Sequence, residues 1–413
     1  MATTVKLGNV DQGAMPADKK KFLAPYHAGM SAELQNMLQF RNDAGWNPFV
    51  QVPGTSVREL QQFLKDAGFM PKALVDGVFG YGTQAAVRLF QEYIRTIEGD
   101  ASIGTPDGIV GPNTWSKINA WKTKYTGKPE FVCAWGRATA QQPSAEFQRW
   151  IDLLSQAKAH FSSLKASHPI VKLVEAYPKA CDTKKVDQWD TSPNTIHLIG
   201  IRRAQEVGSD RRGNDDLFVL LIKGMVFKFW GSTDPNRQMA TRDDIPFLVE
   251  GQHEYQFSWH KASDAEKIYQ ALRPASIGVM VFRDMDKDRA LTQADIDKGL
   301  DPSPNTTVNI HWSGIGSANY SAGCQVIAGN RYMREDGTAV DCQSFAAVKQ
   351  SDLGSGKTRG AYNVFADLIL SYAPEGVRTL RYMLGRDETF KNFEGWDNSF
   401  VAADVEQMRR GLV

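Results

Sequence analysis

The chain of 413 residues has few cysteines, no long apolar run and almost no net charge. Its four cysteines are too sparse for a disulfide scaffold, so packing must hold the core, and a thiol is left over for chemistry. The densest apolar segment, 217–222, has the length of a core strand, whereas a membrane-spanning helix needs about 20 residues. With 48 basic and 47 acidic side chains, the balance argues against a nucleic acid or another partner bound mainly by bulk charge.

The composition, 42% hydrophobic and 23% charged, is typical of a folded globular protein. At about 100 to 200 residues per domain, the length predicts two or three domains. Apolar residues recur at helical spacing up to about residue 164, and the last of these helices, 144–164, carries an aromatic stripe expected in the core. Short strand-like segments, 276–282 among them, follow from about residue 195, and one more helix is predicted at 361–372. We therefore expect a multidomain α+β protein: an N-terminal extension (1–50), a helical domain (51–122), a linker and helical connector (123–190) and a β-rich domain (191–413).

Two segments of the helical domain, 76–83 and 107–115, share one pattern. Each has an Asp-Gly pair, a second glycine and then a threonine in position to cap a helix. Apolar residues at helical spacing follow both copies. The repetition predicts two helix starts of similar construction, and two copies are too few for a solenoid. A capping box is also predicted at 56–59, where another amphipathic helix begins.

The segment 307–324 holds the strongest candidate for chemistry. His311 ends a predicted strand, and Cys324 follows a loop rich in glycine and serine. A strand holds an imidazole rigidly, and such a loop can present a thiol and offer the amides of Gly323 and Cys324 to an oxyanion. The pattern predicts a nucleophile, a base and an oxyanion hole in one hairpin-like unit. The alternative is that Cys324 is a small buried apolar side chain and His311 a hydrogen-bonded core histidine.

Two parts of the chain resemble proteins that act on the bacterial wall. Residues 56–118, with SVRELQQFL, VDGVFGYGTQAAVRLFQ and DGIVGPNTWSKI, resemble the three-helix peptidoglycan-binding domain of bacterial and phage wall enzymes. His311 followed by Ser321-Ala322-Gly323-Cys324 resembles the signature of the YkuD-type L,D-transpeptidase catalytic domain. The chain has Ala322 where that family often has a histidine, and it lacks the arginine usual soon after the cysteine.

The resemblance implies acyl transfer through a thioester on stem-peptide L,D bonds, with no cofactor required. Cys324 would attack the peptide carbonyl, and His311 would accept the thiol proton and return it to the leaving amine. The product would come from an L,D-carboxypeptidase, endopeptidase or transpeptidase reaction, because water or an amine can resolve the thioester. The residues expected to take part are catalytic Cys324, His311, Gly323 and Ser321, and substrate-binding Trp312, His260, Phe79, Tyr81 and Trp115.

An acidic segment predicts a structural calcium ion. Its oxygen-bearing side chains stand at the spacing of calcium-loop positions 1, 3, 5, 9 and 12, and they are Asp284, Asp286, Asp288, Thr292 and Asp295. Arg289 occupies the place where glycine normally makes the sharp turn. The alternative is an acidic surface turn without a metal.

Peptidoglycan is the expected partner, with a phage lysis system, a contractile secretion apparatus or an immunity protein as further partners. The first residues lack the positive segment and apolar stretch of a signal peptide. We therefore expect synthesis in the cytoplasm and non-classical delivery to the periplasm or cell wall, as for a phage lysin or a secreted antibacterial effector. The competing hypothesis is a non-enzymatic wall-docking component of a phage tail or contractile injection system.

Overall fold

The computed structural model describes residues 3–14, 49–72, 74–203, 213–236, 244–261, 268–287, 291–316, 319, 321–354, 356–396 and 400–411. The chain forms two compact units. Unit 1 comprises Met1–Thr139, Lys261–Tyr269 and Gln350–Arg378, and unit 2 comprises Ala140–His260, Gln270–Lys349 and Thr379–Val413. The expected β-rich domain of 191–413 therefore contributes to both units. No described helix is long and apolar enough to cross a membrane.

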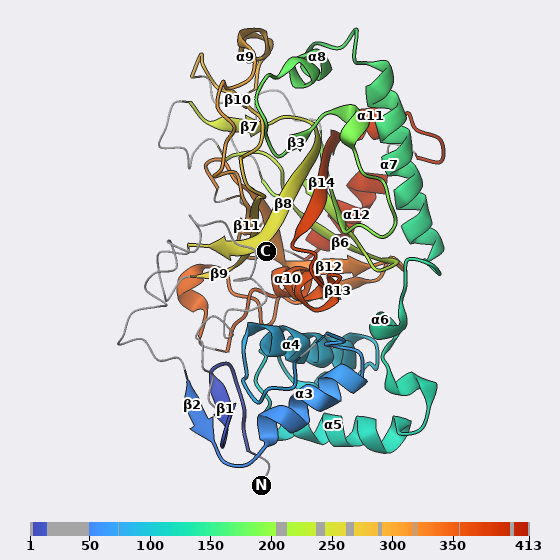
Figure 1. The fold of residues 1–413 in the computed structure, drawn as a ribbon, viewed down its shortest axis with the longest axis vertical. Coiled ribbons are helices and arrows are strands. Elements are labelled where there is room, and N and C mark those ends of the chain that lie inside the picture. The colour runs from blue at the N-terminus through green and yellow to red at the C-terminus, as the bar shows by residue number, and fades with distance from the viewer. Residues whose placement is uncertain are drawn as a thin grey trace. The chain divides into compact units, whose positions relative to one another are not determined.

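Three helices form the centre of unit 1: α3 (Ser56–Asp66), α4 (Tyr81–Thr96) and α5 (Pro112–Tyr125), drawn from blue to teal in Figure 1. Shorter helical turns η2 (Ala101–Ile103), η3 (Pro129–Phe131) and α6 (Ala134–Arg137) follow along the chain. Aromatic rings fill the space between the main helices, for example Phe63 edge-on to Phe90 at 5.3 Å and Phe69 edge-on to Tyr93 at 5.5 Å. The predicted helical domain is present.

Residues 3–14 belong to unit 1, so this part of the predicted extension (1–50) is structured together with the helical domain. Strand β1 (Asn9–Asp11) pairs in parallel with β2 (Val50–Val52), and Val5 bridges to Val110. The buried carboxylate of Asp11 accepts hydrogen bonds from the amides of Val57 and Arg58, both at 2.8 Å. Asp11 therefore satisfies the first amides of α3, where the sequence predicted a local capping box. The predicted extension from 15 to 48 lies outside the described residues.

The two Asp-Gly turns are built alike, as predicted, but through side chains that the sequence analysis did not single out. Gln61 on α3 accepts the amide of Gly77 at 2.9 Å and donates to Asp76, Val78 and Thr83. Gln91 on α4 accepts the amide of Gly108 at 2.9 Å and donates to Asp107, Ile109 and Thr114. The two threonines therefore bind a glutamine amide; Gly80 and Gly111 are the helix N-caps.

Helix α10 (Ala361–Tyr372), whose bounds agree with the prediction, packs on α4 within unit 1. Arg88 on α4 binds Asp367 on α10 through two nitrogen–oxygen contacts of 2.7 and 2.6 Å. Both side chains are buried. Burial raises the pKa of Asp367 to about 6, although Arg88 lowers it. The short helix η6 (Gln350–Asp352) precedes α10.

Unit 2 is built around a closed β-barrel, in which β8 and β14 are the long strands near the centre of Figure 1. The strands follow the order β11-β9-β8-β14-β4-β5-β6-β12, and β12 also pairs with β11, which closes the ring. Their bounds are β4 (His197–Arg202), β5 (Asp216–Ile222), β6 (Met225–Ser232), β8 (Gly251–His260), β9 (Tyr269–Pro274), β11 (Ile310–Trp312), β12 (Gln325–Arg334) and β14 (Thr379–Arg386). Strands β3 (Thr183–Lys184) and β13 (Ala339–Asp341) pair with β8 and β12.

The predicted strand 276–282 is replaced by a turn and a separate strand pair. Three successive amides of the turn, from Ser276, Ile277 and Gly278, donate to the buried carboxylate of Asp182 at 2.9, 2.9 and 2.7 Å. Regular pairing then resumes only in β10 (Val281–Arg283), which is antiparallel to β7 (Pro246–Leu248). Helix α8 (Pro169–Ala176) packs on this pair, and α9 (Gln293–Lys298) follows it.

Helices α7 (Ala145–Ser163) and α12 (Phe400–Arg409) cover the β4–β5–β6 side of the barrel. The aromatic stripe of α7, including Phe147, Trp150 and Phe161, is buried there, as predicted. Ser144 caps α7 by accepting the amide of Phe147 at 3.1 Å. The remaining short helices are η4 (Val186–Gln188) and α11 (Asp387–Phe390).

We predict that Arg88→Met lowers the free energy of unfolding by about 3–5 kcal/mol, because it leaves the buried Asp367 carboxylate without its partner. The folded-state pKa of Asp367 lies above its unfolded value, so its charge costs stability as the pH rises through about 6. The loss should therefore be larger at neutral than at acidic pH in urea unfolding curves. Lys124→Ala, which breaks an exposed pair with Glu98, is the control and should cost less than about 1 kcal/mol. Equal losses for the two variants would contradict the prediction.

Candidate functional site

The parallel pairing of β11 with β12 brings His311 and Cys324 to one place in unit 2. His311 lies opposite Val326, and Cys324 directly precedes Gln325, which lies opposite Ile310. Because side chains alternate along a strand, Cys324 follows the face of Val326 and His311. The hairpin-like unit expected from the sequence is wrong, since the segment between the strands is long enough for a crossover and the pair is parallel.

The imidazole of His311 is held by the backbone. Its Nδ1 donates to the carbonyl oxygen of Trp312 at 2.8 Å, because a carbonyl can only accept. This contact leaves Nε2 as the basic nitrogen of the ring. The side chains of His311 and Trp312 are both buried.

The sulfur of Cys324 contacts the backbone of the strand that leads to His311. Sγ accepts the amide of Asn309 at 3.4 Å and donates to the carbonyl of Thr307 at 3.3 Å. Burial raises the pKa of the Cys324 thiol, whereas the Asn309 amide, the Ser321 hydroxyl and the charge of Arg273 lower it. Arg273 comes from β9, the other neighbour of β11. A cationic group thus acts on the thiol from a distant segment, which the sequence analysis did not detect.

A second histidine, His260, packs on the ring of His311. The ring of His260, at the end of β8, stacks on His311 with centroids 4.2 Å apart and planes 18° apart. Its Nδ1 lies 3.4 Å from Nδ2 of Asn309. Asn309 therefore contacts the sulfur through its backbone and His260 through its side chain. Its Oδ1 atom is buried and has no hydrogen-bond partner among the described residues.

The turn before Cys324 is tightly held. The amide of Ser321 donates to Asn319 Oδ1 at 2.8 Å, and the carbonyl of Ser321 accepts the amide of Asn236 at 2.7 Å. The amide of Gly323, a predicted oxyanion donor, makes only a long contact of 3.5 Å with Ser321 Oγ. A Cβ atom at Gly323 would lie 3.0 Å from Cγ of Pro246, so any larger residue here would require the proline ring to shift.

The predicted substrate-binding residues of unit 1 are placed differently. Phe79 has 0% of its surface exposed, so the expectation that its ring contacts substrate is wrong. Trp115 is also buried, and its Nε1 donates to the carbonyl of Thr3 at 2.9 Å. Their aromatic rings fill the core beside the Asp-Gly turns. Tyr81, the first residue of α4, is partly exposed and stays a prediction.

Three of the five predicted calcium ligands come together. Asp284, Asp286 and Asp295 offer carboxylate oxygens that lie within 4.8 Å of one another, and Asp288 lies outside the described residues. Thr292 donates to Asp286 at 3.3 Å and to Asp295 at 2.9 Å. Asp295 also accepts the amides of Met285 and Thr292, and these contacts lower its pKa although burial raises it. The calcium site stays a prediction, with the N-cap of α9 as the alternative role of Thr292 and Asp295.

Comparisons with known proteins agree with part of this description. Residues 53–96 match the family described as "Putative peptidoglycan binding domain", which confirms the resemblance for the first two helices of unit 1. No curated protein matches the chain. Among solved structures, a fused Zn-dependent amidase/peptidase/peptidoglycan-binding domain-containing protein from Clostridium acetobutylicum ATCC 824 is 14% identical, over 80% of this chain and 96% of that chain. Its TM-score of 0.20 is too low to support any inference about fold or metal.

We predict that calcium, added after chelation, raises the melting temperature of the protein. A ligand at about 100 times its dissociation constant adds about 2.7 kcal/mol to stability. Asp286→Asn should abolish the response, because its exposed carboxylate belongs to the cluster but caps no helix. Asp297→Asn, on the exposed side of α9, should keep it. A wild-type melting temperature that calcium leaves unchanged would exclude the site.

Proposed function

We propose that the chain is a peptidoglycan-directed cysteine enzyme that acts on stem-peptide L,D bonds. The peptidoglycan-binding domain of unit 1 would hold the wall, and Cys324 and His311 of unit 2 would carry the reaction. The observation that carries the proposal is the shared face of β11 and β12, on which a histidine oriented through Nδ1 lies near a half-buried thiol. The Ser-Ala-Gly-Cys turn that resembles L,D-transpeptidases agrees with this chemistry.

The proposed reaction begins with transfer of the Cys324 thiol proton to Nε2 of His311. The thiolate attacks the peptide carbonyl carbon, and the amides of Gly323 and Cys324 stabilise the oxyanion. The tetrahedral intermediate collapses to a thioester as the leaving amine takes the proton from His311. Water or an acceptor amine then attacks the thioester, with His311 as base, and the thiol re-forms. Hydrolysis would give a carboxypeptidase or endopeptidase, and attack by an amine a transpeptidase.

Four side chains would serve the reaction around this centre. Asn309 offers a buried Oδ1 acceptor that has no hydrogen-bond partner within the described part of the chain, which suits a peptide N–H group. Arg273 supplies positive charge beside the thiolate. Trp312 and His260 would contact the substrate, as expected from the sequence.

The biological setting that fits such an enzyme is a phage lysin or an antibacterial effector. Delivery by a phage lysis system or a contractile secretion apparatus would bring it from the cytoplasm to the wall of the target cell. An immunity protein would then be the natural partner in the producing cell.

Cys324→Ala should abolish the change in muropeptide composition when purified sacculi are incubated with the protein and digested for mass spectrometry. Cys181→Ala is the matched control, because Cys181 is also half-buried but lies away from His311 and should leave activity intact. Equal product profiles for wild type and Cys324→Ala would reject the cysteine mechanism.

We further expect the rate of the wild-type reaction to rise from neutral to alkaline pH. Burial raises the pKa of the Cys324 thiol, so little thiolate is present near neutral pH, and its fraction grows as the pH rises. The pH profile of kcat/KM on a muropeptide should therefore have a basic limb, as should alkylation of Cys324. A rate that is highest in acid and falls towards alkaline pH would contradict the expectation.

The competing function is non-enzymatic docking to the wall in a phage tail or injection machine. The raised pKa of the Cys324 thiol favours this alternative, because a protonated thiol is a poor nucleophile. An iodoacetamide-resistant Cys324 at alkaline pH, together with binding of the intact chain to sacculi, would support docking. Rapid alkylation of Cys324 but not of the buried Cys133 and Cys342 would support the enzyme.

A further inference from the structure

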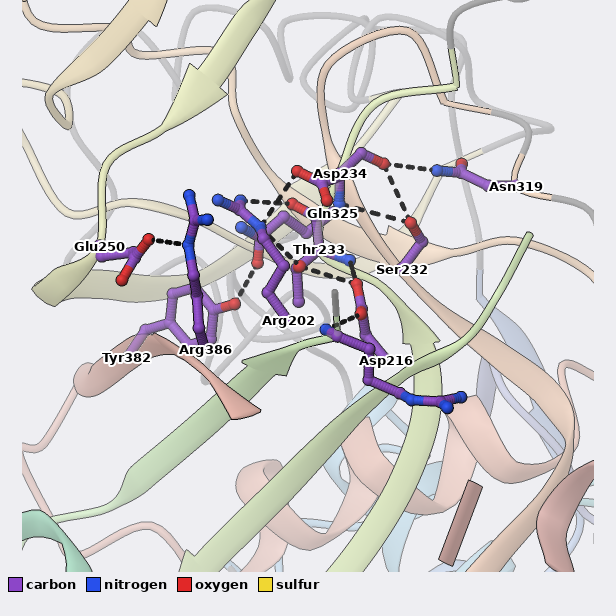
Figure 2. A network of polar contacts seen from close by, with 11 residues as sticks. Arg202, Asp216, Ser232, Thr233, Asp234, Glu250, Asn319, Gln325, Tyr382 and Arg386 are labelled. Carbon is purple, nitrogen blue, oxygen red and sulfur yellow. Dashed lines mark hydrogen bonds and ion pairs between the residues drawn. The ribbon is translucent and has the colours of Figure 1, made fainter. Parts of the chain in front are cut away.

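A buried polar network lies beside the Cys324 turn, and Figure 2 shows its side chains converging from several strands of unit 2. At its centre Arg202, on β4, donates to the hydroxyl and carbonyl oxygens of Thr233, both at 3.2 Å, and forms an ion pair of 3.1 Å with Asp234. Asp216, on β5, accepts the amide and hydroxyl of Thr233 at 2.6 and 2.7 Å. These four side chains are almost completely buried.

The network fixes the short segment 232–236 that leaves β6. Ser232 Oγ donates to the carbonyl of Asp234 at 3.0 Å, which tightens the turn further. Arg202, Asp216 and the Ser232 hydroxyl therefore hold this segment in place. They set the directions of the Asp234 carbonyl and the Asn236 backbone amide. Burying so many polar groups lowers the stability of the fold unless most of them have hydrogen-bond partners.

The backbone groups oriented in this way form hydrogen bonds with the turn that precedes Cys324. Asn319 donates to the carbonyl of Asp234 at 2.6 Å, and its Oδ1 accepts the amide of Ser321 at 2.8 Å. Asn236 donates its amide to the carbonyl of Ser321 at 2.7 Å and its side chain to the carbonyl of Asn319. The Oγ atom of Ser321 in turn lies 3.5 Å from the amide of Gly323, and the Ser321 hydroxyl lowers the pKa of the Cys324 thiol.

On the other side of the cysteine, Gln325 accepts a hydrogen bond from Tyr382. Tyr382 stands on β14, which pairs with β4, the strand of Arg202. The residues before and after Cys324 are thus both held by buried side chains of unit 2. Pairing with β11 alone would fix Gln325 but not the loop that precedes it.

We propose that the Arg202–Asp216–Thr233–Asp234 network is a positioning device for the Cys324 turn and acts through Asn319 and Asn236. The inference rests on the proposed function only in treating Cys324 as the nucleophile. The network touches neither the sulfur nor the imidazole, so its members are positioning residues. It sets the place of the Ser321 hydroxyl and the Gly323 amide, which a glycine-rich loop does not hold by itself.

The test compares two buried asparagines of unit 2. Asn319→Ala removes the grip on Ser321, and Asn330→Ala removes a contact with Trp230 and the end of α12; both side chains are 0% exposed. The pH dependence of Cys324 alkylation by iodoacetamide is followed by mass spectrometry of the Cys324 peptide. Asn319→Ala should shift the alkylation curve to higher pH, because the Ser321 hydroxyl that lowers the thiol pKa is displaced. Asn330→Ala should lower the melting temperature but leave the curve in place.

Activity on muropeptides gives a second readout. Asn319→Ala should reduce kcat by about 100-fold with little change in KM, the size of effect that a misplacement of about 1 Å produces. Thr233→Val, which cuts the link from Arg202 and Asp216, should shift the alkylation curve in the same direction, and Thr233→Ser should restore it. Curves for Asn319→Ala and Thr233→Val that match the Asn330→Ala curve would overturn the proposal.

The two hypotheses fail in different ways. If Cys324→Ala keeps full activity, the proposed function is wrong, yet the alkylation curves still decide whether the network positions the turn. If Cys324→Ala is inactive while Asn319→Ala alkylates and turns over like wild type, the enzyme stands and the positioning role is wrong.

Discussion

The pairing of β11 with β12 is the interaction on which unit 2 depends. It closes the barrel, since without it β11 and β12 would be two edges with unpaired backbone groups. The same pairing sets the register that puts Asn309 beside Cys324 and His311 beside Val326. A shift of one residue would turn Cys324 to the face of Gln325 and Tyr382, inside a buried hydrogen-bonded cluster. Fold closure and the geometry of the candidate site therefore share one set of hydrogen bonds.

The sequence predicted what local patterns control. The bounds of α10, the apolar stripe of α7 and the repeated Asp-Gly turns follow from helical spacing and turn chemistry, which act over a few residues. The peptidoglycan-binding segment was recognised for the same reason, because its motifs are contiguous. His311 and Cys324 could be named from their residue types and context, but whether the strands around them run parallel could not be inferred from spacing.

What the sequence could not predict depends on contacts between distant segments. Asp11 satisfies the amides of α3 across 46 positions, and Arg88 binds Asp367 across 279. Arg273 lowers the pKa of the Cys324 thiol only because the strand order places β9 beside β11. Phe79 was misassigned because an aromatic residue beside an Asp-Gly turn fits a binding surface and a core equally well, and only its burial separates the two.

The electrostatics of Cys324 explain why such distant contacts matter to the proposed nucleophile. Burial disfavours the thiolate, and the groups that oppose this effect come from separate elements: an amide before β11, a hydroxyl in the loop before β12, and the charge of Arg273 on β9. The Asn309 amide and Arg273 are distant from Cys324 in the sequence, so these two groups act on the thiol only while the barrel holds them in place. Low solvent exposure also strengthens every one of these contacts relative to water. Reactivity of the thiol is thus a property of the whole barrel, and a small displacement of the Ser321 turn would change it more than a substitution on the outer helices.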